Sequence, residues 1–169
     1  MTSPMYTTSV PVFKQLLTAM QANLRTTAAA VAARAVDPDA FLQARLYPDL
    51  FPLVKQVQIA CDFARGVSAR LAGVDVPVHD GGEASFADLD RLVDTTLAFI
   101  AGLDAATFEG SEGREIVLRP GTPKERRLGG QAYLCAYGLP QFFFHATTAY
   151  AILRHNGVAI GKKDFMGAY

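Results

Sequence analysis

Leu53–Ala72, with the sequence LVKQVQIACDFARGVSARLA, carries the strongest structural signal in the chain. Apolar residues recur there at three- and four-residue steps, which is the spacing of one face of an α-helix. They are Leu53, Val57, Ala60, Ala64, Val67 and Leu71. Ile59 and Phe63 add an apolar surface on a second side. Because a helix that is apolar on two sides is buried on two sides, this segment predicts a helix packed inside an all-α protein.

Three more segments on either side have the same helical periodicity, and they are residues 9–35, 85–103 and 131–155. Ser9 and Ser85 stand where a side-chain oxygen can cap the first turn. Pro140 lies inside the last segment and is expected to kink or divide that helix. Residues 37–46 predict a short helix, and residues 158–169 are expected to form a coiled tail.

A small β-hairpin is predicted between the third and fourth long helices. Residues 115–119 and 125–128 are short and extended in character, and they flank the turn Pro120-Gly-Thr-Pro-Lys124. Four long helices with one such insert predict a single four-helix-bundle domain over residues 1–169.

The composition restricts the kinds of partner. The 169 residues contain 16 Lys and Arg against 16 Asp and Glu, so no net positive charge draws the chain to nucleic acid or to an anionic membrane. Charged residues are 19% of the chain, below the usual ~25%. Phe142, Phe143 and Phe144 cover most of the circumference of a helix, so at least one faces away from the bundle. We therefore expect a homodimer.

Several features predict a cytoplasmic protein. Residues 128–153 lack Lys, Arg, Asp and Glu, but their Gly, Pro, Gln and His residues indicate a core helix and no membrane span. Cys61 and Cys135 form no Cys-x-x-Cys pair, which indicates two reduced, buried thiols. The first 15 residues show no signal-peptide pattern.

Two polar stripes are the candidate functional residues. On the fourth helix, one face carries Tyr137, Gln141, His145 and Thr148, and on the second helix Gln58 and Asp62 lie four residues apart. If these helices pack together, Asp62 is expected to meet His145, fix its tautomer and raise its pKa. Three interpretations stay open: a structural hydrogen-bonded network, a small-molecule pocket and a metal site. His79 is expected to be solvated, and His155 to favour its helix C-terminus.

Four stretches together resemble a bacterial branch of the DinB/YfiT-like superfamily of metalloenzymes, a branch catalogued as a domain of unknown function. They are Tyr47-Pro-Asp-Leu-Phe-Pro-Leu53, Gln56-Val-Gln-Ile-Ala-Cys-Asp-Phe63, Pro140-Gln-Phe-Phe-Phe-His145 and Leu153-Arg-His-Asn-Gly157. The resemblance covers nearly the whole chain. It implies an up-down-down-up four-helix bundle that is often dimeric.

The resemblance also implies a position for a divalent metal. Metal-binding members of the superfamily use one His on the second helix and two His, four residues apart, on the fourth. Here His145 falls on the second of that pair, while Gln141 and a residue near Gln58 fall on the other two positions. An amide is a poor substitute for imidazole, so we expect no tightly bound transition metal and a degenerate site that binds a small molecule or serves a structural role. The alternative is a hydrolase or thiol transferase that depends on zinc or nickel and uses His145.

Overall fold

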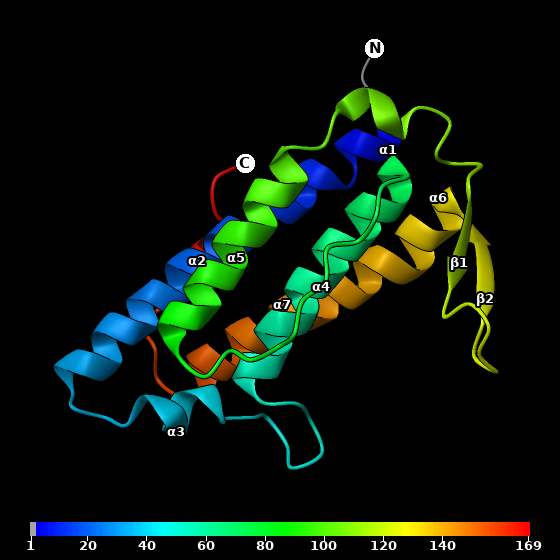
Figure 1. Ribbon diagram of the computed structural model, residues 1–169. Coiled ribbons are helices and arrows are strands. Elements are labelled where there is room, and N and C mark those ends of the chain that lie inside the picture. The colour runs from blue at the N-terminus through cyan, green and yellow to red at the C-terminus, as the bar shows by residue number, and fades with distance from the viewer. Residues whose placement is uncertain (1–2) are drawn as a thin grey trace.

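A computed structural model describes residues 3–169, so the first two residues of the predicted domain lie outside the described part (Figure 1). Within that range, four long helices form a bundle: α2 (Val10–Ala33), α4 (Leu53–Ala72), α5 (Phe86–Ala101) and α7 (Leu139–His155). α2 and α7 point one way along the bundle, and α4 and α5 point the other way (Figure 1). This up-down-down-up order confirms the predicted fold class. No helix in residues 3–169 combines the length and apolarity needed to cross a bilayer.

The parallel pair α4 and α5 requires a long return connection. α4 ends at Gly73, whose φ of +73° is a left-handed conformation that glycine adopts without steric penalty. Residues 74–85 then run back along the bundle as the crossover loop (Figure 1). α5 begins where predicted, because Ser85 Oγ accepts a hydrogen bond from the Asp88 N–H at 3.1 Å. The Asp88 carboxylate in turn accepts from the Ala84 N–H at 3.2 Å.

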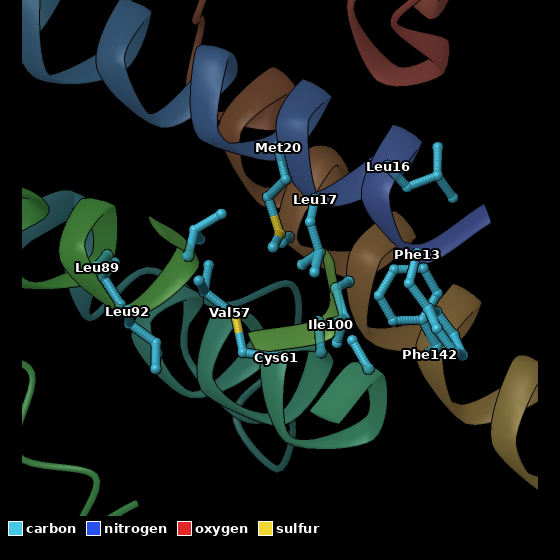
Figure 2. Close-up of a cluster of buried hydrophobic side chains, with 14 of the residues drawn as sticks. Phe13, Leu16, Leu17, Met20, Val57, Cys61, Leu89, Leu92, Ile100 and Phe142 are labelled. Atoms are coloured by element: carbon cyan, nitrogen blue, oxygen red, sulfur yellow. The ribbon is translucent and has the colours of Figure 1, made fainter. Parts of the chain in front are cut away.

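All four long helices contribute buried side chains to the core. Figure 2 shows Phe13, Leu17 and Met20 of α2, Val57 and Cys61 of α4, Leu89 and Ile100 of α5, and Phe142 of α7. The rings of Phe13 and Phe142 meet edge to face with centroids 4.8 Å apart, which joins α2 to α7. Burial raises the pKa of Cys61 to about 12. Cys135 is exposed, so the prediction of two buried thiols is wrong for that residue.

The fourth predicted helix is divided, but in an unexpected form. It consists of α6 (Gly130–Ala132), a π-helical segment η2 (Tyr133–Gly138) and α7. The Leu139 N–H donates to the Leu134 carbonyl five residues back, which is the π-helical pattern. Pro140 then lies in the first turn of α7, directly after the π-helical segment. A Cβ on Gly138 would lie 2.6 Å from Val67 Cγ2, so glycine allows this segment to approach α4 closely.

The predicted coiled tail is wrong, because residues 162–166 form a short helix against α2. This helix, α8 (Lys162–Met166), starts with the Gly161 N–H donating to Asp164 Oδ2 at 2.7 Å. The side-chain amides of Gln15 and Asn23 on α2 donate to the Met166 and Asp164 carbonyls at 2.8 and 3.1 Å. Three further short elements are α1 (Pro4–Thr7), α3 (Pro38–Leu42) and the 3₁₀ turn η1 (Ala105–Phe108). α3 ends before Leu46, the predicted end, because Arg45 donates to the Pro48 and Leu50 carbonyls and holds the following residues in a turn.

The predicted hairpin is present between α5 and α7. Its strands β1 (Glu115–Leu118) and β2 (Arg126–Gly129) are antiparallel, with Leu118 opposite Arg126 and Glu115 opposite Gly129. The hairpin leads directly into α6 and projects beside the segment that begins the last long helix (Figure 1).

Candidate functional site

The stripe predicted on the fourth helix has a buried end and an end that borders a cleft. His145 and Thr148 are each 8% exposed. Thr148 Oγ1 donates to the Phe144 carbonyl at 2.7 Å, so this hydroxyl is used within α7. Tyr137 and Gln141 are half-buried and line a hollow under the hairpin.

His145 is held by a glutamine that the sequence analysis did not select. Its Nδ1 lies 2.7 Å from Gln56 Oε1, and Gln56 Nε2 donates to the Phe51 carbonyl at 3.0 Å. Because the amide nitrogen is engaged with Phe51, the amide oxygen accepts from Nδ1–H, and Nε2 carries the lone pair. Burial lowers the pKa of His145, which favours the neutral imidazole.

The expected contact between Asp62 and His145 is wrong. The Asp62 side chain is 52% exposed and pairs with Arg65, and its Oδ1 lies 3.6 Å from His79 Nδ1. The physical reason is the helical phase. Asp62 follows the buried Ala60 by two residues, which turns it about 200° around the axis of α4, toward the crossover loop.

His79 is not solvated as expected, because it fastens the crossover loop to α4. Its side chain is 14% exposed, and Nε2 lies 2.7 Å from Glu83 Oε1. Gln58 Nε2 donates to Glu83 Oε2 at 2.7 Å and to the Gly81 carbonyl at 3.1 Å. Burial alone would raise the pKa of Glu83, but the hydrogen bonds from His79 and Gln58 outweigh it and hold that pKa below its ordinary value.

The positions that the superfamily resemblance assigns to a metal do not converge. Gln58 faces the crossover loop, and Gln56 occupies the Nδ1 side of His145. Within residues 3–169, no group of three or more His, Cys, Asp or Glu side chains could hold an ion. One imidazole with the Gln141 amide is a weak donor set for zinc or nickel. The residues present therefore do not fit a resident transition metal.

A cleft opens between the hairpin and the helices α4 and α7. Its main hollow, of about 510 Å³, lies between the hairpin and the side chains of Tyr137 and Gln141. An adjoining hollow of about 230 Å³ shares Tyr137 and reaches α4 at Phe63 and Arg70. The main hollow alone lies within the size range of small-molecule sites, about 300–1,000 Å³.

Aromatic rings follow the seam between α4 and the last helical segment. Tyr137 stands between Tyr133 and Phe63, with ring centroids 5.8 and 5.7 Å away. Phe63 continues the row to His145, to which it stacks with centroids 6.1 Å apart. Tyr133 and Tyr137 both belong to the π-helical segment η2, and such segments occur frequently at functional sites. The irregular helix thus supplies Tyr133 and Tyr137 to the aromatic row, and α4 supplies Phe63.

A comparison with protein families agrees with this architecture. The family model described as "Domain of unknown function (DUF1993)" matches residues 5–166. The chain belongs to the DUF1993 family. No curated protein matches it.

A solved relative extends this result to the fold. The crystal structure of a DinB family member protein from Shewanella denitrificans is similar to this DUF1993 chain with a TM-score of 0.90. The two are 37% identical, and the similarity covers 97% of this chain and 92% of that chain. The sequence resemblance to a DinB-like domain of unknown function is confirmed.

Proposed function

We propose that this DUF1993 chain binds a small organic molecule in the cleft between the hairpin and the helices α4 and α7, without a resident metal ion. The observation that carries this proposal is the hollow of about 510 Å³ beside Tyr137 and Gln141, which a second hollow extends toward α4. The lining combines apolar and aromatic surface with polar side chains, as small-molecule sites do.

The arrangement around His145 supports ligand binding that does not depend on a metal ion. His145 lies at the buried end of the aromatic row, with Nδ1 held by Gln56. A hydrolase or thiol transferase that depends on zinc or nickel needs two or three more ligands near this imidazole. Gln58 and Asp62 are engaged with the crossover loop and Arg65, so neither is available for that role.

The experiment is a ligand-observed NMR screen of small aromatic and aliphatic fragments against the full chain, with and without EDTA. We expect hits that persist in EDTA and are lost in Tyr137→Ala, which removes the central ring of the aromatic wall. Tyr47→Ala is the matched control, because Tyr47 is an exposed tyrosine that does not line the cleft. Hits that need added metal, or that survive Tyr137→Ala, would contradict the proposal.

A further inference from the structure

We infer that the ligand of this cleft is an aromatic organic anion, whose charged group is bound by Arg119 and Arg126 of the hairpin and whose ring packs against Tyr137. This inference rests on the proposed function and adds the chemical class of the ligand. Its basis is the direction in which the cationic side chains of the hairpin face.

Arg126 and Arg127 are neighbours with opposite surroundings. Arg127 lies on the outer face of the hairpin, where it pairs with Glu115 at 3.2 Å and Glu125 at 3.0 Å. Arg126 lies opposite Leu118, a buried residue, and therefore on the inner face that lines the cleft. Within residues 3–169, no carboxylate forms an ion pair with Arg126. A guanidinium that lines a cleft and pairs with no carboxylate is free for an anionic ligand.

Arg119 reaches the cleft through an unusual backbone conformation. Ile116 and Leu118 face inward on β1, so strand alternation would turn Arg119 outward. However, Arg119 has a φ of +52°, the left-handed conformation that residues with a Cβ avoid. It lines both the main hollow and the adjoining one. The left-handed turn thus places a second arginine, Arg119, at the cleft.

The far wall supplies a third guanidinium. Arg70 Nη1 donates to the Tyr133 hydroxyl at 3.1 Å beside the adjoining hollow. Gly66 makes room for this group, because a Cβ there would lie 2.6 Å from Arg70 Nη1. Burial raises the pKa of Tyr133 although Arg70 opposes the shift, so the phenol stays neutral and adds no negative charge beside Arg70.

The charges around the cleft therefore have a positive excess. The cationic lining residues are Arg70, Arg119, Lys124 and Arg126, and the acidic ones are Asp62 and Glu125. Both carboxylates are already engaged, Asp62 with Arg65 and Glu125 with Arg127 and the Gly121 N–H. Because the whole chain has no net charge, this excess is a local property of the cleft.

The shape of the cleft favours a small anion over a polyanion. Guanidinium groups bind carboxylates and phosphates in the same bidentate way. The half-buried rings of Tyr137 and Phe63 beside them offer a surface on which a planar ring can pack. A nucleic acid needs a longer track of cationic groups than one hairpin provides. We therefore assign a monomeric aromatic carboxylate or phosphate.

The test is isothermal titration calorimetry of the full chain with 1-naphthoate, its neutral analogue 1-naphthamide, and 1-naphthyl phosphate. We expect naphthoate or naphthyl phosphate to bind at least about tenfold more tightly than the amide; the tighter of the two identifies the anionic group. Arg126→Ala should weaken anion binding about tenfold, whereas Arg127→Ala, the matched control on the outer face, should leave it within about twofold. Both arginines are exposed, so both variants are expected to fold.

Three results would overturn the inference. The first is equal affinity for the acid and the amide. If that binding still depends on Tyr137, the cleft remains the binding site, and only the inference that its ligand is an anion is wrong. The second is no detectable binding of any of the three compounds at millimolar concentration. The fragment screen then tests separately whether the cleft binds small molecules at all. The third is a short DNA oligonucleotide that binds through Arg126 more tightly than either naphthyl anion.

Discussion

Arg119 should limit the stability of the protein while it supports binding, and Arg119→Gly tests both effects at once. A left-handed conformation costs a residue with a Cβ about 1–2 kcal/mol, and Arg119 has a φ of +52°. Glycine removes this penalty but loses about 0.5–1 kcal/mol through the greater freedom of its unfolded chain. The difference between these two effects is a net gain in the free energy of unfolding of about 0–1.5 kcal/mol, with a central value of about 0.75 kcal/mol. With a urea m-value of about 2 kcal/mol/M, this central value corresponds to a rise in the midpoint of about 0.3–0.5 M.

The comparison variant is Arg119→Ala, which removes the guanidinium but keeps the backbone strain. Its free energy of unfolding should stay within about 0.5 kcal/mol of the wild-type value. Both variants should lose about tenfold in affinity for the naphthyl anion. Urea unfolding followed by circular dichroism and calorimetric titration give the two readouts. A glycine variant that is less stable than the alanine variant, or that binds the anion as tightly as the wild type, would contradict this prediction.

Three further predictions concern pH, metal content and assembly. The folded-state pKa of Glu83 lies below its ordinary value of 4.5, so its contribution to stability is present above pH 4.5 and is lost as the pH falls through the folded-state pKa. Glu83→Gln should therefore reduce the fall in the urea midpoint that the wild-type protein shows as the pH is lowered. The same fall in the variant and in the wild type would contradict this. Elemental analysis of protein purified without a histidine tag should find far less than one zinc, nickel or iron per chain. A content near one ion per chain that is lost in the His145→Ala variant would instead favour the metalloenzyme alternative. Phe143 and Phe144 are exposed, so the homodimer remains a prediction that multi-angle light scattering at micromolar concentration tests; Phe144→Glu should give a monomeric mass, and a monomeric wild-type protein would refute it.

The helices could be predicted from the sequence because each repeats its apolar signal several times. The stripe from Leu53 to Leu71 locates α4, and Ser85 with its partner Asp88 fixes the start of α5. The π-helical segment η2 could not be predicted in this way. It depends on how closely Gly138 approaches α4, which is a contact between distant parts of the chain.

The site was harder to predict, since it depends on which side chains face each other across two helices. The spacing along the chain suggested Asp62 as the partner of His145, and the superfamily resemblance placed a residue near Gln58 there. The residue that lies beside His145 is Gln56. A shift of two residues turns a helical side chain by about 200°, so small errors in register exchange one partner for another. His79 lies in a loop with no periodic signal, and only the folded structure brings it to Glu83.

One of the arginines on the hairpin side of the cleft could be predicted from the sequence. Strand alternation separates Arg126 from Arg127 once the hairpin is assumed, and Glu115 and Glu125 are both near enough to pair with the outer arginine. The left-handed conformation of Arg119 has no such signal, because arginine is not a residue that favours positive φ. The sequence could thus have predicted one of the two hairpin arginines in the cleft.

A crystal structure of the protein soaked with the tighter-binding naphthyl anion tests the central claim most directly. We expect the naphthyl ring to lie against Tyr137 and the anionic group beside Arg126 and Arg119, with no metal-ligand bond at His145. Electron density for the ligand at His145 with a coordinated metal ion, and an empty cleft under the hairpin, would contradict it.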